Sequence, residues 1–271
     1  MALLRETFLH IPGVGYRTEE RLWRSGIRTW DDFSAARRPT RIGSRLARRI
    51  DEELGRSAEA LRRGRHRYFA SRLPPRDRWR AWKDFRRDAV YLDIETTGLS
   101  IGRSALTVVG VYDGRRTRSF VQGENLEDLP RALPRAKLLV TFNGSSFYVP
   151  FLRKAFPRLC LDQLHVDLVH PLRRLGFFGG LKSIEAETGI SRSDETAALR
   201  GSDAVRLWHA YQAGNEEALE LLLEYNRHDA ANLEPLAEFA YEALRSLSLE
   251  RGFVTADRYP TGDAGRGSSR G

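Results

Sequence analysis

The chain has 271 residues, of which 41% are hydrophobic and 30% charged, a composition typical of a soluble globular protein with one domain of ordinary size and a smaller one. No uncharged apolar run has transmembrane length, the first residues lack the apolar core of a signal peptide, and Cys160, the only cysteine, excludes an intramolecular disulfide. We therefore expect a cytoplasmic protein with no membrane partner.

The net charge of +9 is unevenly distributed along the chain. Residues 1–87 contain 23 Lys and Arg against 11 Asp and Glu, whereas residues 88–271 contain 22 against 25. This bias favours a polyanion, DNA or RNA, as the partner of the first third. The alternative is a basic surface that only keeps the protein soluble, because 41 of the 45 basic residues are Arg and genome composition also favours Arg.

Residues 1–55 resemble a helix-hairpin-helix module. The motif Ile-Pro-Gly-Val-Gly, residues 11–15, precedes an amphipathic helix expected over residues 18–25, with Thr18 as its N-cap and Gly26 at its end. A second helix is expected over residues 42–54. In such modules glycines let backbone N–H groups approach a phosphate, so Gly13 and Gly15 are candidate nucleic-acid-binding residues. The alternative is a small helical bundle that docks on a neighbour.

Residues 56–87 form a basic segment in which Arg residues alternate with Tyr68, Trp79, Trp82 and Phe85. Aromatic side chains in a basic segment can stack on bases, but beside a domain junction they more often pack in the core. The helix breaker Leu-Pro-Pro, residues 73–75, places a domain boundary within residues 70–86. We interpret residues 56–87 as a linker.

The rest of the chain predicts an α/β fold with a mixed sheet. A strand begins at Val90, and a hairpin with the turn Asp113-Gly114 joins strands over residues 104–112 and 115–122. Strand and helix then alternate, which is typical of parallel pairing. We expect helices over residues 125–133, 147–155, 181–188, 202–213 and 216–244, the last kinked or broken at Pro235, and two strands, 138–142 and one ending at Val166, with Asp167 as an N-cap. Residues 247–271 are expected to be disordered.

Asp93 and Glu95 are the leading candidates for a metal site. They are two residues apart on a strand, so their side chains point to the same face and repel each other unless a cation lies between them. Hard cations such as Mg²⁺ and Mn²⁺ prefer such oxygen ligands. Taken alone, the pair can equally be two ordinary acids at a strand end. Tyr225 and Asp229, four residues apart, lie on one face of the last helix.

Three motifs together resemble those of the DEDD exonuclease superfamily, Tyr subtype. They are Asp93-x-Glu95-Thr96-Thr97-Gly, then Asn143-Gly-Ser-Ser-Phe147, and Tyr225-x-x-x-Asp229. With the stretches 167–174 and 181–185, the pattern is similar to that of ribonuclease H-like proteins of the YprB type. The resemblance implies a ribonuclease H-like exonuclease domain over residues 88–246, with a mixed five-stranded sheet flanked by helices, preceded by a small all-α module.

The resemblance also implies metal-dependent 3′-to-5′ exonuclease activity on DNA or RNA by a two-metal type mechanism. Asp93, Glu95 and Asp229 would be the ligands of Mg²⁺ or Mn²⁺, and Tyr225 would orient the attacking water. Thr96, Thr97, Asn143 and Phe147, in the motif segments, would contact the nucleic acid.

Tyr148 departs from the motif, which has an Asp after Phe147. A neutral phenol is a poor ligand for a hard cation. Three readings follow: an enzyme with a weakened second metal ion, an enzyme in which another acid such as Asp194 or Asp203 substitutes, or a catalytically impaired nucleic acid-binding module. We favour an enzyme. A protein that only binds partner proteins through its helical module is a further alternative, which salt dependence would separate from nucleic acid binding.

Overall fold

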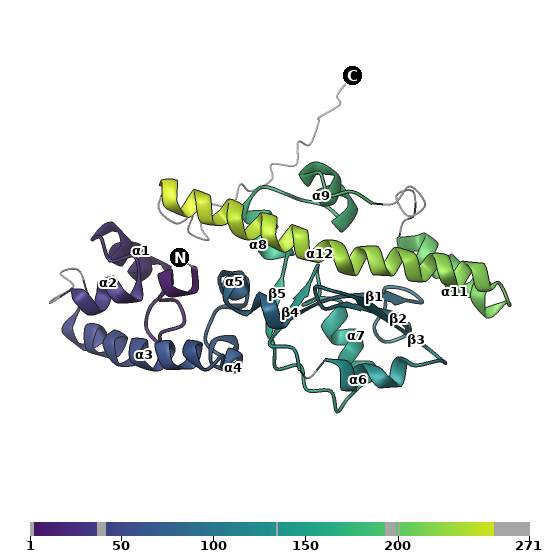
Figure 1. Cartoon of the computed structure of the whole chain (residues 1–271), viewed down its shortest axis with the longest axis horizontal. Helices are drawn as coiled ribbons and strands as arrows, with labels where there is room; N and C mark the ends of the chain where they lie inside the picture. Colours follow the sequence, from purple (N-terminus) through teal and green to yellow (C-terminus); the bar gives the residue numbers. More distant parts are fainter. Residues whose placement is uncertain (1–2, 37–41, 134, 193–198, 200, 252–271) are drawn as a thin grey trace, which may run out of the picture.

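The structure is a computed structural model that describes residues 3–36, 42–133, 135–192, 199 and 201–251. Figure 1 shows a long C-terminal helix that runs along much of the molecule, with a sheet beneath its middle and the N-terminal helices at one end. The strands are β1 (Ala89–Thr96), β2 (Leu106–Tyr112), β3 (Thr117–Val121), β4 (Leu138–Thr141) and β5 (Leu164–Asp167). The α-helices and 3₁₀ turns (η) are η1 (Leu3–Glu6), α1 (Tyr16–Arg24), α2 (Trp30–Ala35), α3 (Ser44–Arg62), α4 (His66–Ala70), η2 (Pro75–Ala81), α5 (Trp82–Phe85), η3 (Arg86–Asp88), η4 (Leu126–Asp128), α6 (Leu129–Ala132), α7 (Tyr148–Ala155), α8 (Val169–Arg174), α9 (Leu181–Thr188), α11 (Gly201–Gln212) and α12 (Glu216–Arg251).

The five strands form one mixed sheet in the order β3-β2-β1-β4-β5. β1 pairs antiparallel with β2 and parallel with β4, so it is the central strand, and β3 and β5 lie at the edges. The predicted fold class, a mixed five-stranded sheet flanked by helices, is confirmed. β1 pairs with β4 over residues 89–91 and with β2 over residues 91–96, and this pairing fixes its register and hence the face on which each side chain lies.

The two faces of β1 pack against different helices. Leu92 and Ile94 belong to an apolar cluster with Phe151 of α7, whereas Tyr91 belongs to a cluster that includes residues of α12. In Figure 1, α12 lies above the sheet and α6 and α7 lie below it. Because side chains alternate along a strand, the odd-numbered residues of β1, including both candidate carboxylates, face α12.

The N-terminal helices share one apolar core with the sheet domain. The cluster that contains Leu3, Trp30 and Phe69 continues to the buried residues of α12, and the backbone N–H of Leu3 donates a hydrogen bond of 2.9 Å to the hydroxyl of Tyr241. The expected division of the chain at residues 55 and 87 stays a prediction.

Three of the four aromatic side chains noted in the basic segment are in the core, and Tyr68 is half-buried against it. Trp79, Trp82 and Phe85 are all buried, which leaves their rings unavailable to stack on bases, and the segment itself folds into short helices. The sequence left open whether these side chains stack on bases or pack in the core, and in the structure Trp79, Trp82 and Phe85 pack in the core. Exposed arginines of the segment, such as Arg65, Arg72 and Arg76, remain able to meet a phosphate.

Buried ion pairs also join the N-terminal helices to the rest of the protein. Arg80 donates to Glu19 at 3.1 Å and lies 3.5 Å from Asp77, which also accepts from Arg174 at 2.8 Å. All four side chains are almost fully buried. Burying a charge is costly unless it is paired, so these contacts fix which surfaces of the two parts meet.

Two expected helix limits at the N-terminal end were wrong. Gly15, not Thr18, is the N-cap of α1, because the carbonyl of Gly15 already accepts from the N–H groups of Thr18 and Glu19. The helix expected to end at residue 54 continues to Arg62, because the buried face of α3 continues with Ser57 and Ala60.

Two expectations in the second half also need correction. Asp167 ends β5 and is not the N-cap of α8, which is Leu168. The last helix is not broken at Pro235 but continues to Arg251, because Leu233 and Leu236 on either side of the proline are fully buried and hold it in place. Five residues of the tail that we expected to be disordered are therefore helical, and 252–271 lie outside the described residues. Within the described residues, no helix is both long and apolar enough to span a membrane.

Candidate metal centre

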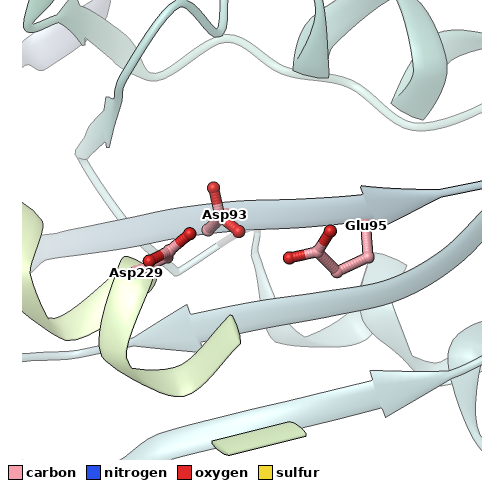
Figure 2. Close-up of side chains that lie close together, drawn as sticks. All are labelled: Asp93, Glu95 and Asp229. Atoms are coloured by element: carbon pink, nitrogen blue, oxygen red, sulfur yellow. The ribbon is translucent and has the colours of Figure 1, made fainter. Parts of the chain in front are cut away.

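Three carboxylates meet where β1 faces α12. Asp93 and Glu95 come from the strand and Asp229 from the helix, and each offers an oxygen such that these atoms all lie within 4.8 Å of one another. Figure 2 shows Asp93 beside Asp229, with the carboxylate of Glu95 turned toward them. The three residues are only 4%, 8% and 7% exposed, respectively. The structure thus brings together the three predicted metal ligands.

Asp93 is held by a hydrogen bond to each of its oxygens. The Tyr148 hydroxyl donates to Oδ1, and Asn226 Nδ2 donates to Oδ2 at 2.8 Å. Asn226 is fully buried and reaches Asp93 because β2 carries a glycine, Gly110, opposite Asp93 in the strand register. A Cβ atom at Gly110 would lie 2.3 Å from Asn226 Oδ1, so only glycine fits there. β1, β2 and α12 together therefore fix the carboxylate of Asp93.

The loop after β4 brings Tyr148 to Asp93. Asp167 Oδ1 accepts from the N–H of Asn143 at 2.8 Å, and its Oδ2 accepts from the N–H of Ser145 at 2.9 Å. Asn143 has a left-handed backbone with φ of 60°, and a Cβ atom at Gly144 would lie 2.1 Å from a side-chain oxygen of β4. This tightly closed loop leads directly into α7, of which Tyr148 is the first residue. The loop thus presents a phenol to Asp93 at the position where the motif has an acid.

Burial controls the protonation of the cluster. It raises the pKa of Asp93 and Glu95 well above their usual values, and each is raised further by a neighbouring carboxylate. Burial also raises the pKa of Asp229, although the nearby Arg192 opposes this effect. The pKa values of Tyr148 and Tyr225 are raised by burial and by the adjacent carboxylates, so both phenols are neutral near pH 7. The three acids therefore cannot all ionise without more positive charge.

Two cationic side chains lie on the Asp229 side of the site. Arg192 forms ion pairs with Asp229 and with Glu185 of α9, and its side chain is 7% exposed. Lys182, also on α9, places its Nζ atom 4.6 Å from the centre of the Tyr225 ring. The site therefore combines three acids with cations from a different part of the chain.

Most of the predicted site residues line one cavity of about 540 Å³. Its wall also includes Leu99, Phe142 and Val205, so the acids lie at a recess with an apolar side. The predicted residues in the lining are Asp93, Glu95, Thr96, Asn143, Phe147, Tyr148, Tyr225 and Asp229.

Other predicted residues lie elsewhere. Thr97 is not in the lining of this cavity; its hydroxyl accepts from the N–H of Ala105 at 2.9 Å, which closes the loop that follows β1. Gly13 and Gly15 lie just before α1, and their role stays a prediction. Asp203 pairs with Arg206 rather than joining the three acids, and Asp194 lies outside the described residues.

A family model describes most of this region. The model of the RNase_H superfamily matches residues 90–241, which is more than half of the chain. The chain belongs to the RNase_H superfamily. The matched stretch contains all three carboxylates and Tyr148, and it begins at β1, so the superfamily domain is the sheet with its flanking helices.

Several solved structures resemble this superfamily member in part. The family B DNA polymerase from the archaeon Pyrobaculum calidifontis has a TM-score of 0.46 and 17% identity, over 59% of this chain and 25% of the polymerase. Brucella melitensis NrnC has a TM-score of 0.41 and 22% identity, over 61% of this chain and 77% of NrnC. The superfamily assignment rests on the family match, and this chain spans only a quarter of the polymerase. A search of curated proteins found no match.

The donor set fits a hard divalent cation. It consists of carboxylate oxygens, the ligands that Mg²⁺ and Mn²⁺ prefer. All three acids are buried, and of the three only Asp229 forms an ion pair among the described residues, so Asp93 and Glu95 leave negative charge that a bound cation would compensate.

Two residues that contact the acids were not predicted from the sequence. Asn226 could have been predicted from the sequence, because it is three residues before Asp229 and hence on the same face of the helix. Arg192 could not have been predicted, because it is distant in sequence from all three motifs and the helix before it carries no motif that points to a metal site. Only the fold brings it to Asp229.

Proposed function

We propose that this protein is a metal-dependent nuclease that removes nucleotides from the 3′ end of DNA or RNA. One observation carries the proposal: the buried oxygens of Asp93, Glu95 and Asp229 lie within 4.8 Å of one another at a cavity open to ligands. Buried like charges are costly, and a fold keeps them only where a cation, and the chemistry it serves, compensates. The 3′-to-5′ direction rests on the resemblance of the motifs to DEDD exonucleases.

The three acids would hold Mg²⁺ or Mn²⁺, which when bound supplies an activated water and stabilises charge on the phosphate. Tyr225 has a neutral phenol close to Asp229, so it would position the attacking water by a hydrogen bond rather than remove its proton. Asn226 would keep Asp93 in the orientation that faces the other two acids. The apolar wall at Phe147 would exclude bulk water and pack against a base or sugar.

We propose that Thr96 and Asn143, in the cavity lining, contact the nucleic acid there, and that Gly13 and Gly15 contact its backbone farther along. Gly13 has a φ of 89° and lies near Arg49 of α3, so an open backbone and an exposed arginine occur together beside the start of α1. Backbone N–H groups and arginines bind phosphate without reading sequence. This arrangement would hold the substrate while its end enters the cavity.

A second candidate is favoured by one contact: the protein binds nucleic acid in the same cavity with impaired catalysis. The Tyr148 hydroxyl already satisfies Asp93 Oδ1, and Tyr148 adds no negative charge for a second metal ion. Such a module would bind single strands in a salt-dependent way but would cleave them slowly or not at all.

The test is the polarity of cleavage. Single-stranded DNA and RNA labelled at the 5′ end, with a circular strand as control, are incubated with the protein and Mg²⁺ or Mn²⁺. We expect a ladder that shortens from the 3′ end and an intact circle. Cleavage of the circle would instead mean endonuclease activity, and binding without cleavage would favour the second candidate.

A further inference from the structure

Two of the three acids, Asp93 and Asp229, already have a protein partner on one carboxylate oxygen. Asp93 Oδ1 accepts from the Tyr148 hydroxyl, and Asp229 Oδ1 lies against the Arg192 guanidinium. Glu95 also lines the cavity and completes the set. The number of cations that this site takes is therefore set by Tyr148 and Arg192 as well as by the acids.

The balance of charge in the cluster also favours a single bound cation. The three carboxylates carry three negative charges when ionised, Tyr148 is neutral, and Arg192 is permanently positive. Glu185, which pairs with Arg192, and Lys182, whose charge acts on Asp229, belong to the same cluster and bring its total to four acids and two cations. One divalent cation then neutralises the cluster, whereas two would leave an excess of positive charge. A buried charge without a counter-charge is strongly unfavourable, so the arrangement with one cation is the favoured one.

Arg192 is built into the structure rather than lying on the surface. Its Nε donates to Glu185, itself almost fully buried, and its side chain is 7% exposed. Among the described residues, Nη1 and Nη2 form no well-directed hydrogen bond, so the guanidinium is held against Asp229 mainly by charge. Its Cζ also lies 6.0 Å from the centre of the Tyr225 ring. A fixed cation of this kind is always present, unlike one drawn from solution.

We propose that this site takes a single divalent cation, held by Asp93, Glu95 and Asp229, with Tyr148 and Arg192 in place of a second one. The inference deepens the proposed nuclease function and rests on it. Tyr148 holds Asp93 by a hydrogen bond, and Arg192 supplies the second positive charge of the site. The site then differs from the motif in two ways that act together: Tyr148 replaces an acid, and Arg192 adds a positive charge.

The experiment is calorimetric titration of the metal-free, full-length protein with MnCl₂. We expect about one Mn²⁺ per chain for the natural protein. Tyr148→Asp should create a second, weaker site, because it replaces a neutral donor with a carboxylate beside Asp93. Tyr148→Phe, which removes the hydroxyl but adds no ligand, should still bind one. Two ions in the natural protein, or no change in number in Tyr148→Asp, would overturn the proposal.

Arg192→Gln tests the counter-ion role. Removing a positive charge next to Asp229 should tighten Mn²⁺ binding roughly tenfold, since a nearby like charge opposes the cation. Arg245→Gln is the charge-matched control, because Arg245 pairs with Glu242 near the far end of α12. The Mn²⁺ affinity of this variant should equal that of the natural protein. Unchanged or weaker binding in folded Arg192→Gln would overturn the counter-ion role. Should Arg192→Gln fail to fold, as judged by circular dichroism, the Tyr148 variants still decide the stoichiometry.

The outcome separates this inference from the proposed function. One Mn²⁺ per chain without any strand cleavage would leave the single-cation site standing and reject the nuclease. Cleavage with two Mn²⁺ per chain would keep the nuclease and reject the single-cation site. No Mn²⁺ binding would reject both.

Discussion

The Tyr148 hydroxyl, at the start of α7, donates a hydrogen bond to Asp93 Oδ1 in the middle of the central strand. This contact links the residue that departs from the exonuclease motif to the acid at the centre of the cluster. Asn226 donates to the other oxygen, so each oxygen of Asp93 accepts one hydrogen bond from the protein and keeps a free lone pair. The site is thus preorganised at Asp93, and Arg192 compensates only part of its negative charge.

Asp93→Asn should make the metal-free protein more stable. The substitution removes one of three buried like charges, and an amide can accept from Asn226 and donate to the Tyr148 oxygen, so both hydrogen bonds have a replacement. We expect the melting temperature in chelator to rise by at least about 2 °C. Mn²⁺ should then raise it further in the natural protein but not in the variant. A variant that is less stable than the natural protein in chelator would show that the three acids do not repel one another.

The stability gain of Asp93→Asn should depend on pH. Burial raises the pKa of Asp93 and Glu95 above their unfolded values, so the folded protein holds these protons at higher pH than the unfolded chain does. Their favourable contribution is complete below the unfolded pKa, near pH 4, and is lost as pH rises through the folded pKa. The difference in melting temperature between the two proteins in chelator should therefore be large at pH 8 and shrink toward pH 5.

Comparing two proteins removes the effect of other groups that titrate in that range. Burial lowers the pKa of His10 to about 3, so its contribution to stability falls as pH drops below its unfolded pKa of 6.5. This trend has the opposite direction to that of the acids, and it is the same in both proteins. A difference in melting temperature that stays constant from pH 5 to pH 8 would contradict the raised carboxylate pKa values.

Asp167→Asn should loosen the loop that carries Tyr148. Asp167 accepts from the backbone N–H groups of Asn143 and Ser145, and an amide can accept at only one of its two positions. One partly buried N–H would lose its charged acceptor, at a cost of roughly 1–3 kcal/mol in the free energy of unfolding. Denaturant unfolding measures this change. An unchanged midpoint would mean that the loop does not depend on Asp167.

The sequence predicted the sheet and the placing of Asp93 and Glu95 on one face, because strand periodicity is a local property. The meeting of both with Asp229 was predicted from the resemblance of the motifs to DEDD exonucleases. The contacts that set the charge of the site could not be predicted in this way. Arg192 meets Asp229 only through the packing of α9 against α12. Asp167 looked like a helix cap because an Asp before a helix usually is one, but its carboxylate is used by a loop far away in sequence. Pro235 predicted a break in the last helix, but buried leucines on both sides keep that helix continuous.

Arg80→Met should destabilise the junction between the N-terminal helices and the sheet domain. Arg80 is 1% exposed and pairs with the buried Glu19, so its removal leaves a buried acid without its adjacent cation. Losing one partner of a buried ion pair typically costs roughly 3–5 kcal/mol. Arg62→Met is the matched control, because Arg62 pairs with Glu59 on the exposed surface and should change stability by less than about 1 kcal/mol. Equal effects of the two substitutions would contradict the structural role of Arg80.

Arg45→Gln combined with Arg49→Gln should weaken the binding of single-stranded DNA and flatten its dependence on salt. Both arginines are exposed on α3, and Arg49 lies near Gly13. Each lost phosphate contact should reduce the salt slope by about 0.7. Arg115→Gln with Arg116→Gln, a change of equal charge on the hairpin turn, is the control. Fluorescence anisotropy at several salt concentrations gives both slopes, and equal losses in the two variants would mean that the N-terminal helices are not the docking surface.

Asp93 is the residue whose substitution tests most directly whether the buried acids at β1 and α12 support metal-dependent cleavage of nucleic acid. The measurement is the rate of shortening of 5′-labelled single strands by the natural protein and by folded Asp93→Asn, each in Mn²⁺ and in chelator. We predict cleavage only by the natural protein with Mn²⁺, and a loss of at least about a hundredfold in the variant, the size of effect expected when groups that stabilise transition-state charge are removed. Equal cleavage by the two proteins, or cleavage that persists in chelator, would contradict the assignment of this site.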